Sequence, residues 1–126
     1  MTIRIGLVGT GSIAKRNYIP CLADQQDVSL GYFNRTQSKA EAVAEEFGGE
    51  VFDSLEALID WSPDSVFVLT RETERLAISQ DLLSLNPRRL FFEKPLVAAE
   101  GQENVSEDDF VAARALLHRA AVQQCE

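Results

Sequence analysis

Histidine and cysteine are scarce in this sequence of 126 residues, which holds one histidine and two cysteines. Cys21 and Cys125 are isolated thiols without the spacing of metal ligands, so we expect neither a disulfide nor a metal site from them. His118 falls in the last helical pattern and is expected to be a surface or packing residue. The sequence therefore indicates no metal centre.

Long apolar runs and positive charge are also lacking. No run of about 18 apolar residues occurs, and the N-terminus lacks the charged and then apolar pattern of a secretory signal. Lys and Arg number 12 against 20 Asp and Glu, which gives a formal net charge of −8. Nucleic acids and anionic membranes both require a basic protein surface, so neither partner is expected. We expect a cytoplasmic protein.

What is present is the composition of an ordinary globular domain, with 45% hydrophobic and 25% charged residues. The length fits one domain that is large enough to bury a core. Neither internal repeats nor low-complexity tracts occur. We therefore expect residues 1–126 to form a single domain.

Strand-like and helix-like stretches alternate along the chain. Apolar runs of the strand type occupy residues 3–8, 28–33, 50–52, 65–70 and 89–92. Helical patterns occupy residues 12–25, with a restart at Pro20, and residues 36–47, 54–59, 76–83 and 106–120. Strands joined by helices make right-handed crossovers, so we predict an α/β fold of the Rossmann type. It is a doubly wound parallel sheet in three layers, with strand order 3-2-1-4-5.

Particular residues predict where these helices begin and which face they bury. Thr36 is expected to cap its helix, and Asp53 or Ser54 to cap the next one. Residues 98–104 are expected to form an exposed loop. The last helix carries an apolar set on one face, typical of packing against a domain: Phe110, Ala113, Leu117 and Ala120.

The segment from Gly9 to Ala14 follows the first strand and opens a helix. In a dinucleotide-binding corner of the form Gly-x-Gly-x-x-Ala, the first glycine allows a tight turn and the second lets backbone approach a pyrophosphate. The small third residue lets the helix pack closely on the sheet, and the helix start adds free N–H groups. A purely structural glycine turn is the alternative. The predicted cofactor contacts here are Gly9, Thr10, Gly11, Ser12 and Ile13.

Further candidate residues follow the other strands. In a doubly wound sheet, ligands bind beyond the carboxyl ends of the strands, where the strand order reverses. This edge brings the glycine corner together with the residues that end the second, fourth and fifth strands. The predicted cofactor contacts among them are Asn34, Arg35, Thr70, Glu93 and Lys94.

The end of the second strand predicts which cofactor binds. NAD-selective sites usually place an acid at position 34 to bind the ribose 2′-hydroxyl. Because Asn34 stands there instead, Arg35 can pair with a 2′-phosphate, and Thr36 and Lys39 lie close enough to help. We therefore expect NADP in preference to NAD, with an exposed arginine in a β-to-α turn as the alternative.

Several motifs together carry a family resemblance. They are Gly9 to Ala14, Ile19-Pro20-Cys21-Leu22, Asn34-Arg35 followed by Lys39-Ala40, and above all Glu93-Lys94-Pro95-Leu96. Residues 2–97 resemble the glucose-fructose oxidoreductase/inositol dehydrogenase (Gfo/Idh/MocA) family.

The resemblance implies an oxidoreductase that uses a nicotinamide cofactor on a sugar, a polyol or a related carbonyl compound. It implies that Lys94 is catalytic and lies beside the nicotinamide and the substrate, where an ammonium can hydrogen-bond the reacting oxygen and help its proton transfer. Glu93 would lie near the cofactor, and Pro95 is associated with a cis peptide bond. A solvated loop lysine is the alternative for Lys94.

The sequence departs from the family in two places. After the fourth strand the family usually has Thr-Pro-Asn and then a histidine, whereas only Thr70 matches here and charged residues follow over 71–75. The family also continues into an α/β substrate domain, which often supports dimers. This chain ends where the sixth strand would begin, so we expect that domain to be absent from it. The partners implied by the resemblance are a small sugar-like substrate and a homo-oligomer.

Two functions remain open. The first is the NAD(P)-binding domain of an oxidoreductase that transfers hydride between a nicotinamide cofactor and a sugar-like substrate. The second is a non-catalytic nucleotide-binding or protein-interaction module that has lost the chemistry. The retained Glu93-Lys94-Pro95 motif favours the first, and the charged segment after Thr70 favours the second.

Overall fold

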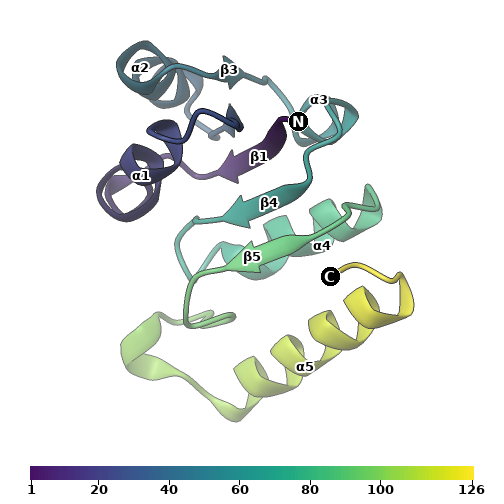
Figure 1. Cartoon of the computed structure of the whole chain (residues 1–126). Coiled ribbons are helices and arrows are strands. Elements are labelled where there is room, and N and C mark those ends of the chain that lie inside the picture. Colours follow the sequence, from purple (N-terminus) through teal and green to yellow (C-terminus); the bar gives the residue numbers. More distant parts are fainter.

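The computed structural model describes all 126 residues and shows a five-stranded sheet whose strands all pair in parallel (Figure 1). The strands are β1 (Ile3–Val8), β2 (Val28–Phe33), β3 (Glu50–Val51), β4 (Ser65–Val68) and β5 (Leu90–Phe92). Their order is β3-β2-β1-β4-β5, which confirms the prediction. The order reverses at β1, so the segment that follows β1 lies at the switch point of the sheet.

Helices cover both faces of the sheet. They are the π-helical segment Ala14–Tyr18 with α1 (Ile19–Ala23), then α2 (Gln37–Phe47), α3 (Leu55–Asp60), α4 (Arg75–Ser84) and α5 (Glu107–Val122), with a 3₁₀ turn at Gln102–Asn104. Successive side chains of a strand point to opposite faces. Leu7 therefore joins the core beneath α1 and α2, and Val8 joins the core beneath α3 and α4, both fully buried.

The first helical stretch changes geometry where the sequence predicts a restart. The backbone runs as a π-helix over Ala14–Tyr18 and resumes as α1, with Pro20 in its first turn. Proline has no N–H to donate, and it is best tolerated at such a position. The wider turn places Tyr18 against β4 and β5, with its ring edge-on to Phe67 at 6.0 Å and to Phe91 at 5.8 Å.

The predicted caps are borne out in part. Ser54, one of the two candidates, accepts a hydrogen bond from the N–H of Ala57 at 3.0 Å. Thr36 occupies the N-cap position of α2, but its side chain makes no capping hydrogen bond. The carbonyl of Thr36 instead accepts a bond from the Asn34 side chain at 3.0 Å.

The stretch 98–104 is not the wholly exposed loop that its composition predicts. Ala98 is fully buried, and its N–H donates to the carbonyl of Glu72 at 3.4 Å. Residues 99–104 are largely exposed, and they end in the 3₁₀ turn. The segment after β5 is thus tied back to the loop that follows β4, which brings the two loops together at the carboxyl edge of the sheet.

The prediction for the face of α5 was wrong at its two large residues. Phe110 is 69% exposed and Leu117 is 55% exposed, whereas Leu116 is 4% exposed and packs inward. The helix lies along α4, with its first turn fixed by a capping box between Ser106 and Asp109. Because alanines line both sides of α5, the spacing of the apolar residues alone could not select the inward face.

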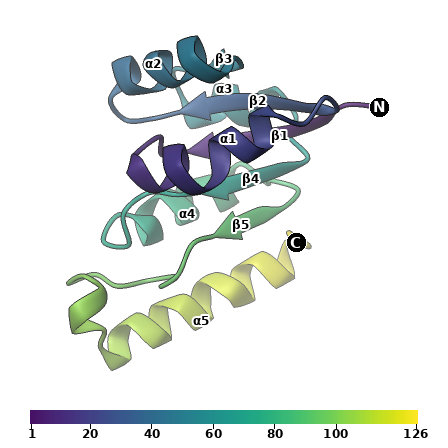
Figure 2. The ribbon, with the colours of Figure 1, turned by 60° about the vertical axis from the view of Figure 1, so that its left-hand side comes forward.

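The chain end lies beside β5 in both views (Figure 1 and Figure 2). The N–H of Leu90 donates to the Glu126 carbonyl at 2.7 Å, and the N–H of Glu126 donates to the Arg88 carbonyl at 3.1 Å. This alternation is that of a parallel ladder. None of the helices combines the length and apolar character needed to cross a bilayer.

Candidate functional site

Gly9 makes a turn that no other residue could make without strain. Its φ is +97°, and a Cβ built there would lie 2.9 Å from the N of Thr70 and 3.0 Å from the carbonyl carbon of Leu69. Both neighbours are backbone atoms and cannot rotate away. The N–H of Gly9 donates to the Phe33 carbonyl at 2.9 Å, so the turn is clamped between the ends of β2 and β4. Glycine is thus required here by the fold itself.

Gly11 is different, because nothing in the chain requires a glycine there. Its φ lies outside the left-handed region, and a Cβ would meet no atom within 4 Å. Gly11, Ser12 and Ile13 are exposed, and their N–H groups donate to no acceptor in the chain. The helical bonds begin with the N–H of Lys15, which donates to the Gly11 carbonyl at 3.0 Å. The corner therefore offers free donors and open space, as an incoming diphosphate requires.

The small residue of the motif has the predicted packing role. Ala14 is 1% exposed and belongs to the same core cluster as Ile5 and Leu7 of β1. A larger side chain at position 14 would push the helix away from the sheet. That displacement would move the free N–H groups of residues 11–13 away from the switch point.

Asn34 holds the corner from the side of β2. Its Oδ1 accepts a hydrogen bond from the N–H of Thr10 at 3.0 Å, and its Nδ2 donates to the Thr36 carbonyl. Thr10 itself is only 2% exposed, and its hydroxyl oxygen has no hydrogen-bond partner. The side chain of Asn34 therefore holds the backbone of the turn at Thr10, and the side chain of Thr10 is buried.

Arg35 extends from the rim with its side chain 83% exposed, and it is paired. Its Nη2 donates to Oε1 of Glu74 at 2.7 Å. Glu74 is the N-cap residue of α4, yet its side chain makes no capping bond. Sequence reasoning missed this partner, because the pairing joins residues that are 39 positions apart.

Arg75 is the second residue that the sequence reasoning missed. It is 3% exposed, and its guanidinium donates to the Thr70 carbonyl at 2.6 Å, to the Glu93 carbonyl at 2.6 Å and to the Pro95 carbonyl. Burial lowers the pKa of Arg75, while the carboxylates of Glu72 and Glu93 oppose that shift. The guanidinium thus joins the ends of β4 and β5.

A signal for Arg75 was present in the sequence. The buried residues of α4 recur at helical spacing, as Arg75, Ser79, Leu82 and Leu83. Periodicity therefore places an arginine on the inward face of this helix. An arginine there needs several acceptors, since a buried cation is costly unless it is hydrogen-bonded.

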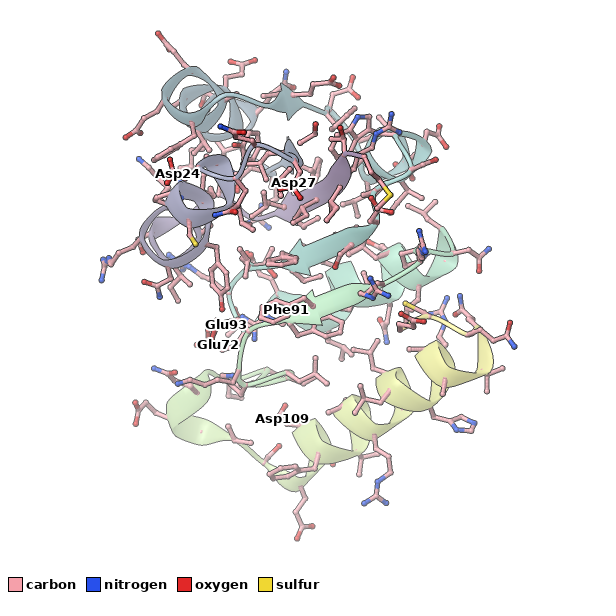
Figure 3. All side chains as sticks on the ribbon, in the orientation of Figure 1. Asp24, Asp27, Glu72, Phe91, Glu93 and Asp109 are labelled. Atoms are coloured by element: carbon pink, nitrogen blue, oxygen red, sulfur yellow. The ribbon has the colours of Figure 1, made fainter.

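Glu93 and Tyr18 form a polar pair next to the aromatic cluster. The Tyr18 hydroxyl donates to Oε2 of Glu93, and this bond, with burial and the nearby negative charge, raises the pKa of Tyr18. Figure 3 shows Glu93 and Glu72 at the same end of the sheet, beyond Phe91 of β5. Tyr18 was also missed, since its place depends on the π-helical turn.

Lys94 is exposed at this edge, and it forms no ion pair or hydrogen bond with the rest of the chain. The peptide bond from Lys94 to Pro95 is cis. Arg75 holds the carbonyls of the residues before and after Lys94, so the backbone at Lys94 is fixed while its ammonium is free. Thr70 lies at the same edge, with a buried hydroxyl oxygen that lacks a partner.

The structure brings the predicted residues to one edge of the sheet, along an open rim. Two surface cavities, of about 530 and 480 Å³, lie elsewhere, and none of the predicted site residues lines either one. No group of three or more acidic, histidine or cysteine side chains is arranged to hold a metal ion. Both cysteines are free thiols.

A glycine corner with free amide donors, at the switch point of a doubly wound parallel sheet, defines a dinucleotide-binding domain. The comparison with known families agrees. The model of the Gfo/Idh/MocA family, an oxidoreductase family with an NAD-binding Rossmann fold, matches residues 3–121. The chain belongs to this family.

Relatives share both the sequence and the fold. A Salmonella typhimurium protein, YceM, classed as an oxidoreductase by name, is 32% identical over 96 residues, which are 75% of this chain and 31% of that protein. The 3-ketoreductase KijD10 from Actinomadura kijaniata, solved with NADP and TDP-benzene, superposes with a TM-score of 0.79 at 24% identity over 98% of this chain and 35% of that one.

A third relative is the UDP-N-acetylglucosamine 3-dehydrogenase GnnA from Acidithiobacillus ferrooxidans. Its TM-score is 0.79 at 22% identity, over 99% of this chain and 36% of that one. The present chain therefore spans about a third of the length of the relatives that it matches. At these identities the two solved structures support the fold.

Proposed function

We propose that the chain is the cofactor-binding domain of an oxidoreductase that transfers hydride between a nicotinamide cofactor and a sugar, a polyol or a related carbonyl compound. The observation that carries this proposal is the glycine corner. The N–H groups of three exposed residues, Gly11, Ser12 and Ile13, have no acceptor in the chain, and the space where a Cβ of Gly11 would lie is open. Main-chain donors at a helix start are suited to bind a diphosphate.

The residues of the rim fit the rest of a dinucleotide. Arg35 has the planar fork that binds a 2′-phosphate in two contacts, and Asn34 places no negative charge beside it. These features support NADP in preference to NAD. When bound, the nicotinamide supplies or accepts the hydride.

Lys94 is the residue that we assign to the reacting oxygen. Its ammonium is exposed and has no partner in the chain, so it can donate a hydrogen bond to a substrate oxygen at this edge. Such a donor stabilises negative charge on an alkoxide and can pass a proton to it. Arg75 fixes the backbone on both sides of Lys94. The similarity to GnnA, a UDP-N-acetylglucosamine 3-dehydrogenase, supports a sugar-like substrate for the whole protein.

The chain alone also fits a second function, that of a nucleotide-binding module without catalysis. The charges at Arg71 and Glu72 favour it, because they stand where the family usually has a proline and a neutral amide. The substrate domain, the oligomeric state and the cytoplasmic location remain predictions. Both functions require the glycine corner to bind a dinucleotide.

Gly11→Val tests that requirement. A Cβ at position 11 would have no atom of the chain within 4 Å, so we expect the fold to persist, whereas the branched side chain would occupy the space that a diphosphate needs. We expect the dissociation constant for NADPH, measured by fluorescence titration, to rise at least tenfold, with the unfolding midpoint in urea nearly unchanged.

The matched control is Ala115→Val, which adds the same side chain at an exposed position of α5. It should leave NADPH binding unchanged. If the wild-type chain binds neither NADPH nor NADH at millimolar concentration, or if Gly11→Val binds NADPH as the wild type does, the proposed function is wrong.

A further inference from the structure

The ion pair between Arg35 and Glu74 lies across the proposed cofactor site. Arg35 follows β2, and Glu74 stands at the start of α4, after β4. Because β1 lies between β2 and β4 in the sheet, the pair bridges the carboxyl end of β1, where the glycine corner begins. The contact joins Nη2 to Oε1 at 2.7 Å, and it is the only ion pair that either residue makes.

We propose that Glu74 is a specificity-determining residue for the cofactor, whose carboxylate competes with the 2′-phosphate of NADP for the guanidinium of Arg35. The inference rests on the proposed function, since it concerns the same site. It assigns to Glu74 a role that opposes the preference for NADP that Arg35 creates.

The helix does not need this carboxylate. Acidic side chains at a helix start often serve as caps, but Glu74 makes no capping hydrogen bond to α4. The only side-chain hydrogen bond that its carboxylate makes is the one to Arg35. The buried anchor of the same helix is the neighbouring Arg75, whose guanidinium hydrogen-bonds to neither Arg35 nor Glu74.

The charges of the two coenzymes decide how the Glu74 carboxylate changes their affinity. A 2′-phosphate carries close to two negative charges at neutral pH, and it must either displace the Glu74 carboxylate from Arg35 or lie beside it. Either arrangement weakens NADP binding. NAD carries a 2′-hydroxyl, which needs no cation and can donate a hydrogen bond to a carboxylate. Glu74 therefore narrows the gap in affinity between the two coenzymes.

The size of the effect is modest because the pair is exposed. The side chains of Arg35 and Glu74 are 83% and 35% accessible to solvent. Exposed ion pairs contribute little, although removal of the carboxylate also removes its repulsion of the phosphate. We expect Glu74→Gln, which keeps the shape and removes the charge, to tighten NADPH binding about three- to tenfold.

The experiment is a fluorescence titration of the wild type and Glu74→Gln with NADPH and with NADH, at low ionic strength. The dissociation constant for NADPH should fall, and that for NADH should stay the same or rise slightly. Glu45→Gln is the matched control, since it removes the same charge from an exposed position of α2 that forms no ion pair with Arg35. It should change NADPH binding less than twofold.

The same substitution in an Arg35→Gln variant distinguishes competition for the Arg35 guanidinium from a general electrostatic effect on NADPH binding. In an Arg35→Gln chain, Glu74→Gln should no longer improve NADPH binding, because the group for which the two anions compete is gone. An unchanged ratio of NADPH to NADH affinity in Glu74→Gln, or an equal gain in the Arg35→Gln background, would overturn the inference and leave the proposed function standing. Failure of the wild type to bind either coenzyme would overturn both.

Discussion

At the scale of single residues, Arg75 shows how a buried cation can organise a site without an ion pair. Its guanidinium reaches three main-chain carbonyls from two loops, and no carboxylate hydrogen-bonds to it. Carbonyl oxygens thus make the hydrogen bonds to the cation, while the nearby carboxylates of Glu72 and Glu93 act on it only through their charge. The arrangement fixes the backbone around Lys94, whose side chain stays free.

Arg75→Met should destabilise the domain by about 2–4 kcal/mol, because it leaves three carbonyl groups without their donor. The free energy of unfolding in urea measures this loss. Arg75→Lys is the graded control, since one ammonium cannot reach all three carbonyls and should restore only part of the stability. A loss below about 0.5 kcal/mol for Arg75→Met, which is the range of ordinary surface substitutions, would show that the hydrogen bonds of Arg75 contribute little to stability.

Single residues also show which features the sequence could predict and which it could not. Gly9 and Ala14 could be predicted from the sequence because the motif encodes a local role for each, a tight turn and close packing of the helix on the sheet. The partner of Arg35 could not, since it depends on how two distant loops approach each other. Asn34 was predicted to contact the cofactor, and the structure uses its amide to brace the turn at Thr10.

At the scale of elements, α5 depends on one carboxylate at its start. Oδ1 of Asp109 accepts from the N–H of Ala99 at 3.0 Å, and Oδ2 accepts from the N–H of Ser106 at 2.9 Å. These two bonds lower the pKa of Asp109. Asp109 therefore joins the start of α5 to Ala99, in the segment that follows Lys94 and Pro95 along the chain.

The lowered pKa gives a pH dependence with a definite sign. A carboxyl group whose pKa is lower in the folded state stabilises the fold above its unfolded pKa, about 3.9 for aspartate, and this contribution is lost as pH falls through the folded value. Asp109→Ala should therefore be less stable than the wild type at pH 7, and the difference should shrink below about pH 4.

Urea unfolding at pH 7, 5, 4 and 3 measures this difference. Asp108→Ala is the matched control, because it removes the neighbouring acid of the same helical turn, which makes no hydrogen bond of this kind. A difference for Asp109→Ala that stays constant across the pH range would contradict the assignment.

The elements also show why periodicity predicts some helix faces and not others. In α2 the buried positions Ala40 and Val43 stand out against charged neighbours, so the spacing of apolar residues indicates the inward face. In α5 large apolar residues fall on both sides, and the choice was made by packing against α4 and by the contact from Asp109 to Ala99. Neither is visible in the spacing of residues.

At the scale of the whole molecule, the strand order could be predicted because few topologies satisfy short right-handed crossovers between parallel strands. The location of the candidate site followed from that order, since a doubly wound sheet has one switch point. The identity of the substrate did not follow, because the chain matches only about a third of the length of its relatives.

The role of Lys94 belongs to this scale, since turnover requires the whole enzyme. There Lys94→Ala should lower kcat by about 10²-fold or more, through loss of the donor to the reacting oxygen. Affinity for NADPH should change less than threefold, because the glycine corner is untouched. Steady-state kinetics and a coenzyme titration measure the two effects separately, and unchanged turnover would remove Lys94 from the mechanism.

The pairing of Glu126 with β5 has a practical consequence for anyone who fuses this domain to another polypeptide. The last residue is already in register beside Arg89 and runs in the same direction as β5, toward the edge that carries Lys94. A purification tag joined at this end starts at the amino edge of the sheet and would be directed along β5 toward the rim where coenzyme binding would be measured. Met1 is fully exposed and precedes the opposite end of β1, so the tag belongs there.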